Sequence, residues 1–307
     1  MVVVFIAMTI ITLLHAADAA QEEAHWKLST DAVLTSTFNS YTQNWGRPES
    51  GSFLWTGRSS TLAAKKLSRR LYQENSLKIA FGQIKFSDKE TKKWSSPQKS
   101  TDLIDMETVT KLKQEDFRVN PFLSLRAVSQ FYDTRDPDNR RYANPATFTK
   151  SFGASKYILK QPDINWKMRL GGALRCNIDR DAIPYHYIDG DWIKLNHRET
   201  SVITDAGAEL VTEFKMKRGD AGCVTGRLTV FEALARPADL QTEGWRYPDI
   251  TFETTIKINI TKHLIFNYAM KMIYDREIDP DPRIRQAFSA GLSLSLTNER
   301  STKGNKK

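Results

Sequence analysis

The 307-residue sequence has only two cysteines, Cys176 and Cys223, and five histidines. Two cysteines are too few for a disulfide scaffold, and they lack the partners that a zinc site needs. Charged residues make up 26% of the chain and hydrophobic residues 40%, which excludes both a helical membrane protein and a disordered chain. The longest apolar run, residues 2–14, is shorter than the roughly 20 residues of a membrane-spanning helix.

The N-terminal run predicts an export signal. Residues 2–14 are apolar, and the small residues Ala17 and Ala19 follow in an Ala-x-Ala step. We therefore expect residues 1–19 to be a signal peptide, in preference to a buried strand or a lipid-facing anchor. The protein would then act outside the cytoplasm.

The rest of the sequence alternates with a period of two and shows little helical periodicity. In residues 164–178 the even positions are mostly apolar, including Trp166 and Leu170, and the odd positions carry charges such as Lys167, Arg169 and Arg175. This alternation continues for about three times the length of an ordinary soluble strand. One face is therefore apolar and the other charged over an unusually long strand.

Segments of this kind recur along the chain, and their connections alternate between long and short. Long loops with short turns are typical of a transmembrane antiparallel up-and-down β-barrel with about 12 strands. We predict this all-β fold for residues 20–298, followed by a polar tail at 299–307. The predicted strands are 25–41, 50–64, 72–87, 102–112, 117–132, 151–160, 164–178, 205–217, 222–234, 249–261, 263–275 and 286–297.

The charged face would line the barrel interior, because hydrocarbon accepts only apolar side chains and a closed sheet. Asp105 and Glu107 on the fourth segment would then lie near bases on the next. This pattern fits a cation-lined constriction that selects anionic solutes, or an internal salt-bridge network that fills a narrow lumen, with the second favoured. The predicted lumen-lining residues are Arg118, Arg126, Lys167, Arg169, Arg175, Glu209, Glu213, Arg227, Glu253 and Lys257.

Several short stretches resemble one family in their order and spacing. They include Arg141-Tyr142-Ala143-Asn144-Pro145, Arg169-Leu170-Gly171-Gly172-Ala173-Leu174-Arg175 and Lys257-Ile258-Asn259-Ile260-Thr261-Lys262. From about Trp26 to Leu296 the chain resembles the outer-membrane β-barrel family known as domain of unknown function 3078, from Gram-negative bacteria. The resemblance implies an outer-membrane barrel and supplies no catalytic residues. This sequence departs from the family by ending its last strand at Leu296, before a polar tail.

No catalytic residues, metal site or cofactor are predicted. A loop-borne acyltransfer site would use His186 or His197 with Ser201, and acidic loops around Asp133 and Asp179 could hold Ca²⁺. Solvated loops explain these residues better. The expected partners are outer-membrane lipid, lipopolysaccharide, the barrel-assembly machinery and a small polar or anionic solute, but not nucleic acid, because the basic residues are dispersed.

The sequence thus predicts a non-enzymatic outer-membrane barrel with both termini in the periplasm, serving as a passive pore or a structural barrel with a partly plugged lumen. Two alternatives stay open: an outer-membrane lipid-modifying enzyme, acyltransferase or phospholipase-like, and a soluble periplasmic barrel that binds an apolar ligand. In the soluble barrel Leu170 would be buried and Arg169 would face water. Cys176 and Cys223 are expected to remain free thiols.

Overall fold

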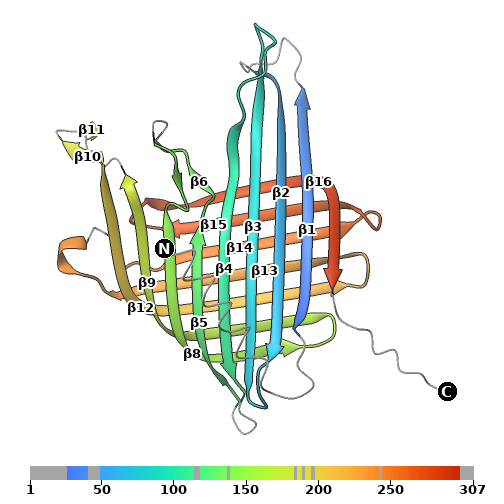
Figure 1. Cartoon of the computed structure of the whole chain (residues 1–307), viewed down its shortest axis with the longest axis vertical. Helices are drawn as coiled ribbons and strands as arrows, with labels where there is room; N and C mark the ends of the chain where they lie inside the picture. Colours follow the sequence, from blue (N-terminus) through green and yellow to red (C-terminus); the bar gives the residue numbers. More distant parts are fainter. Residues whose placement is uncertain are drawn as a thin grey trace.

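The computed structural model describes residues 26–40, 49–113, 118–136, 139–182, 185–188, 191–194, 198–241 and 244–297. Within these ranges, twelve long strands form one closed antiparallel barrel (Figure 1). Each long strand pairs with the next along the chain, and β1 pairs with β16 to close the sheet. The barrel strands are β1 (Lys27–Ser40), β2 (Glu49–Lys66), β3 (Leu71–Asp88), β4 (Gln98–Leu112), β5 (Asn120–Ser129), β8 (Ala146–Lys160), β9 (Ile164–Ala182), β12 (Glu199–Arg218), β13 (Gly222–Ala235), β14 (Asp249–Asn259), β15 (Leu264–Asp275) and β16 (Asp279–Thr297).

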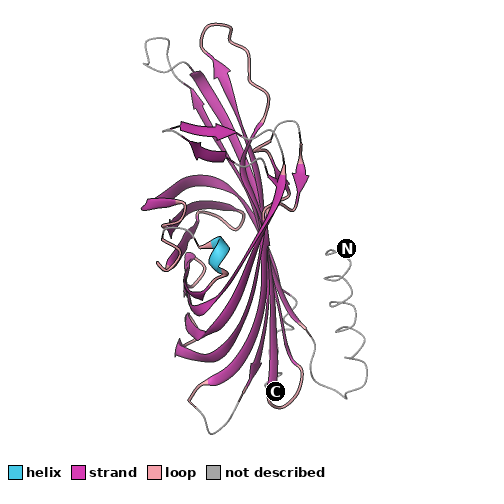
Figure 2. Cartoon of the chain, turned by 90° about the vertical axis from the view of Figure 1, so that its left-hand side faces the viewer, coloured by secondary structure: helices cyan, strands magenta, loops and turns pink. Residues whose placement is uncertain are grey.

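The twelve-stranded antiparallel barrel is therefore confirmed, and every predicted segment overlaps one barrel strand. In Figure 1, β1–β4 run nearly along the long axis of the barrel, and β13–β15 run across the picture behind them. Figure 2 shows the resulting curvature of the sheet, with the short 3-10 helix η1 (Ala238–Leu240) as the one helix drawn among the described residues. No helix in these ranges is long and apolar enough to cross a membrane.

The main corrections concern the long loops. The predicted fifth strand extended to residue 132, but β5 ends at Ser129, because the backbone N–H groups of Phe131 and Tyr132 donate to the carboxylate of Asp102 instead of continuing the ladder. The loop predicted at 179–204 is shorter, because β9 and β12 extend into it and pair as far as Glu199. Four short strands form in the loops: β6 (Tyr132–Asp133) with β7 (Arg141–Tyr142), and β10 (Tyr185–Ile188) with β11 (Asp191–Lys194).

The apolar face of the sheet points outward. The side chain of Leu170 is on the outer surface of β9 and 55% exposed, whereas its neighbour Arg169 is only 4% exposed. On β16, Leu292 and Leu294 are exposed while Ser293 between them is buried. A soluble barrel would show the reverse pattern. The soluble, apolar-cored alternative is therefore wrong.

Both ends of the barrel sequence lie at one rim. Ser29, near the start of β1, pairs with Thr297 at the end of β16. The connections between β2 and β3, β4 and β5, β8 and β9, β12 and β13, and β14 and β15 lie at this same rim. The longer loops lie at the other rim, with one exception: the loop predicted between residues 275 and 286 is reduced to 276–278, because β16 begins at Asp279. We call these two rims the short-turn end and the long-loop end. The predicted signal peptide (residues 1–19) and the polar tail at 299–307 lie outside the described residues. Cys176 and Cys223 are free, as predicted.

Candidate functional site: ion pairs inside the barrel

A row of alternating charges crosses five neighbouring strands on the inner face. In the register of the sheet, Lys167 on β9 lies opposite Glu213 on β12, which lies opposite Arg227 on β13. Arg227 lies opposite Glu253 on β14, and Glu253 lies opposite Lys271 on β15. Because side chains directly opposite each other in a ladder are in contact range, this order places opposite charges side by side. Ion pairs of 2.8–3.2 Å join Lys167 to Glu213, Arg227 to Glu213 and Lys271 to Glu253.

The interior is also crossed by ion pairs between strands that are not neighbours. Glu107 on β4 accepts hydrogen bonds from Nη2 of Arg169 on β9 at 2.5 Å and from Nη1 of Arg227 on β13 at 2.7 Å. Strands β5, β8, β9 and β12 stand between β4 and β13 in the sheet. The bond from Arg227 to Glu107 therefore passes through the barrel interior and links opposite parts of its wall.

A second acid makes a similar link nearby. Glu74 on β3 accepts bonds from Lys111 on β4 at 2.9 Å and from Lys167 on β9 at 3.2 Å. Arg126 on β5 makes a two-pronged pair with Asp105 on β4 at 2.9 and 3.0 Å. The central network thus joins charges from six strands. We use this name for Glu74, Asp105, Glu107, Lys111, Arg126, Lys167, Arg169, Glu213 and Arg227.

The centre of the network is shielded from water. The side chains of Glu107, Arg169 and Arg227 are 5–8% exposed. Ser124 on β5 donates a further bond to Glu107 at 3.2 Å. Two guanidinium atoms, Nη1 of Arg169 and Nη2 of Arg227, are buried with no hydrogen-bond partner within the described residues. A buried charge is costly when its partner is removed, and the loss of Glu107 would leave Arg169 without an acid partner and Arg227 with Glu213 alone.

The ten predicted lumen residues have different positions. Arg126, Lys167, Arg169, Glu213 and Arg227 meet in the central network. Arg175 pairs with Asp249, nearer the long-loop end, and Glu253 pairs with Lys271. Glu209 and Lys257 are half-buried and form no ion pair within the described ranges.

The prediction that Arg118 lines the lumen is wrong. Strand β5 begins only at Asn120, so Arg118 lies in the β4–β5 turn and is exposed. Glu74 and Lys111 were missed, although both lie in segments recognised as strands. Their signal was available in part. Glu74 alternates with Ser76 and Lys78, and Lys111 shares its face with Asp105 and Glu107, although Val109 interrupts that polar face.

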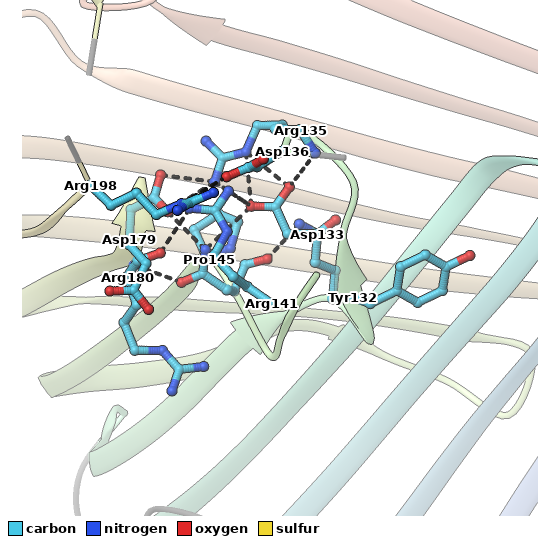
Figure 3. A network of polar contacts seen from close by, with 12 residues as sticks. Tyr132, Asp133, Arg135, Asp136, Arg141, Pro145, Asp179, Arg180 and Arg198 are labelled. Carbon is cyan, nitrogen blue, oxygen red and sulfur yellow. Dashed lines mark hydrogen bonds and ion pairs between the residues drawn. The ribbon is translucent and has the colours of Figure 1, made fainter. Parts of the chain in front are cut away.

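A second polar cluster holds the β5–β8 loop to the neighbouring strand at the long-loop end (Figure 3). The carboxylate of Asp133, 1% exposed, accepts bonds from Arg135 at 2.8 Å and Arg141 at 2.5 Å. Arg135 also binds Asp179 on β9 at 2.8 Å, and the side-chain N–H of Asn144 donates to Asp179 at 2.8 Å. We call Asp133, Arg135, Arg141, Asn144 and Asp179 the loop clasp.

The charges of the loop clasp explain the ionisation of Asp133. Burial alone would raise the pKa of its carboxyl group, but the hydrogen bonds from Arg135 and the charges of Arg135 and Arg141 outweigh burial and lower the pKa to about 2. These acids therefore bind arginine instead of gathering around an ion. Within the described residues, no three His, Cys, Asp or Glu side chains form a metal-binding group.

The proposed acyltransfer residues do not form a described site. The side chain of His186 and all of His197 lie outside the described residues, and Ser201 is exposed near the start of β12.

Comparison with known proteins finds likeness only among solved structures. No family model and no curated protein matches the chain. Among solved structures, the chain is similar to an outer membrane channel from Pseudomonas putida F1, with 12% identity, a TM-score of 0.44 and coverage of 91% of this chain and 98% of that one. It is also similar to the translocator domain of the autotransporter NalP from Neisseria meningitidis, with 9% identity, a TM-score of 0.36 and coverage of 95% and 94%.

A third solved structure with this likeness is OprB from Pseudomonas putida, with 11% identity, a TM-score of 0.28 and coverage of 94% and 96%. At such identities and TM-scores, the similarities say nothing about what this chain transports or binds. The resemblance to domain of unknown function 3078 stays a prediction.

Proposed function

We propose that this chain is an outer-membrane β-barrel that acts as a narrow passive pore, constricted by the central network. The observation that supports this most directly is the inverted distribution of side chains: apolar residues cover the outside of a closed barrel, and buried ion pairs occupy its inside. Only a barrel surrounded by hydrocarbon is stabilised by that distribution, because hydrocarbon covers the apolar exterior and excludes unpaired backbone groups.

The constriction follows from the pairs that cross the interior. Arg227 and Glu107 join opposite parts of the wall, and Lys167 and Glu74 make a second link between non-neighbouring strands. A solute must pass beside these links, so the conductance should be small compared with that of an open porin of wider bore. The network has five basic and four acidic members, so we expect a modest preference for anions.

The orientation belongs to the same proposal. The short-turn end, with both ends of the barrel sequence, would face the periplasm after removal of residues 1–19, and the long-loop end would face outward among lipopolysaccharide. The barrel-assembly machinery would insert the chain. Short periplasmic turns and longer outer loops are the usual arrangement in this class of protein.

Planar-bilayer recording of the purified protein tests the pore. We expect small, steady conductance steps with a weak anion preference, and a reversed preference in Arg169→Glu and Arg126→Glu. Folding of these variants is checked by the difference in electrophoretic mobility between heated and unheated samples. A folded, inserted barrel without conductance at any voltage would remove the pore and leave the structural role or the enzymatic alternative, for which phospholipase and acyltransferase assays are the direct test.

A further inference from the structure

The short-turn end carries a ring of exposed basic side chains that the pore does not use. Every one of its five turns is bordered by at least one of them. We call this set the basic rim: Arg69, Arg70, Lys113, Lys160, Arg218 and Lys262. The exposed acids of the same turns are Asp163 and Asp220. Glu115 and Asp116, in the turn after Lys113, lie outside the described residues.

The basic rim is not neutralised within the barrel. None of its six side chains forms an ion pair with a carboxylate within the described residues. At the long-loop end, in contrast, arginines pair with acids of other segments: Arg135 with Asp179, Arg198 with Asp136 and Arg236 with Glu277. Exposed bases such as Lys92, Lys93 and Arg140 also occur at the long-loop end, but there part of the positive charge is compensated by these pairs, whereas none of the basic rim is paired with a carboxylate within the described residues.

The position of the rim points to lipid. The exposed apolar residues Trp166, Met216 and Ile260 lie on the strand ends and turns that carry the rim. On β8 the exposed Lys156 lies near the exposed Ile158 and Leu159, so apolar and basic side chains share the outer surface there. Lys160 follows a bulge in β8, lies opposite Asn165 and places its ammonium group over the ring of Tyr157. Lysine at such a boundary extends its apolar stem along the hydrocarbon and places its ammonium group among the headgroups.

We infer that the basic rim binds the phosphate groups of anionic phospholipids in the leaflet at the short-turn end. This inference rests on the proposed membrane location. Anionic headgroups attract basic side chains placed close to the membrane surface, and the attraction falls off within a Debye length, so only charges at the boundary contribute. The rim surrounds the barrel mouth at that boundary and would hold a shell enriched in acidic lipid.

Tryptophan quenching by brominated lipid measures this enrichment when all proteins carry Trp94→Phe, because Trp94 is exposed at the long-loop end and Trp166 is exposed at the short-turn end. The full chain is folded into phosphatidylcholine vesicles that contain a minor fraction of either brominated phosphatidylglycerol or brominated phosphatidylcholine. We expect stronger quenching by the acidic lipid. In the variant Arg69→Gln/Arg70→Gln/Lys262→Gln the preference should fall by about fivefold or more, the factor associated with one basic side chain near an anionic leaflet.

A matched variant removes three basic charges from the long-loop end: Lys92→Gln/Lys93→Gln/Arg140→Gln. All three side chains are exposed in the β3–β4 and β5–β8 loops, so this control removes the same number of positive charges at the end opposite the basic rim. It should keep the wild-type preference. Equal loss in the two triple variants, or equal quenching by the two lipids in the wild type, overturns the inference.

Free phosphate is distinguished from lipid phosphate by competition. Inorganic phosphate should lower the lipid preference no more than sodium chloride of the same ionic strength, since both then act by screening. A specific loss with phosphate assigns the rim to soluble anions and overturns the lipid assignment. If the chain does not insert at all, the heated and unheated samples migrate alike, and the proposed function falls with the inference. An inserted, conducting barrel without lipid preference leaves the pore standing.

Discussion

Replacing Glu107 with glutamine removes one negative charge from the centre of the network and keeps the size of the side chain. In the wild type, its two carboxylate oxygens accept separate bonds from Arg169 and Arg227. After the change Arg169 has no carboxylate at ion-pair distance, whereas Arg227 keeps Glu213 at 3.2 Å. The variant therefore buries one arginine with no acid partner and one with a weaker pair.

The magnitude follows from burial. Removing one member of a buried ion pair costs about 3–5 kcal/mol, because the remaining charge stays desolvated. The retained pair of Arg227 with Glu213 places the expected loss at the lower end, about 3 kcal/mol. Glu253→Gln is the matched control, since the pair of Glu253 with Lys271 is 31–41% exposed, and exposed pairs contribute about 0–1 kcal/mol.

Urea unfolding of the vesicle-inserted barrel, followed by tryptophan fluorescence and by heat-modifiable mobility, measures both variants. We expect Glu107→Gln to lower the free energy of unfolding by about 3 kcal/mol and Glu253→Gln by less than about 1 kcal/mol. Glu107→Gln should also raise single-channel conductance, because one cross-barrel link is weakened. Equal and small losses in the two variants would show that the interior is wet and that the network is not a buried constriction.

Three further outcomes are expected. Leu170→Arg, on the outer face of β9, should cost about 2–4 kcal/mol of unfolding free energy in vesicles, as charge near the bilayer midplane does, and a cost near zero in the urea titration would contradict the lipid-facing assignment. The folded-state pKa of Asp133 is about 2, against an ordinary value of 3.8, so its contribution to stability is fully present above about pH 4 and is lost as the pH falls through 2. Cleavage of the loop by pepsin should therefore rise only towards pH 2 in the wild type and already at higher pH in Asp133→Asn. Equal cleavage of the two proteins at every pH would refute this. Arg236→Ala leaves Asp205, 1% exposed, without its paired guanidinium and should destabilise the barrel by about 3–5 kcal/mol in thermal melts read by near-UV circular dichroism, whereas a shift no larger than that of an exposed arginine would argue against a buried pair.

The alternation of residues 164–178 was enough to place β9 and to assign its two faces, because the period of a strand is two in any environment. The same reasoning found all twelve barrel strands. It failed at the ends of strands. Arg118 was assigned to the lumen because the fifth strand was predicted to begin at residue 117, but the start of β5 is set by where pairing with β4 and β8 begins, which no local pattern reveals.

The candidate site was visible only in part. The inner-facing charges on β9, β12 and β13 could be listed from parity, and several of them do meet. Which acid binds which base could not be listed, since Glu107 is separated from Arg227 by 120 residues and by four intervening strands. The role of Glu74 was missed for the same reason: its partner Lys167 is on a strand that β3 never touches in the sheet.

By itself the sequence determined the class of fold, the number of strands and which side chains share a face, because each of these depends on local periodicity and on the lengths of connections. The closure of β1 onto β16, the cross-barrel pairs of Glu107 and the clasp of Asp133 on the loop were decided only by the tertiary structure. These contacts depend on the stagger of strands around a closed sheet, and that stagger is fixed by the pairing of all twelve strands together.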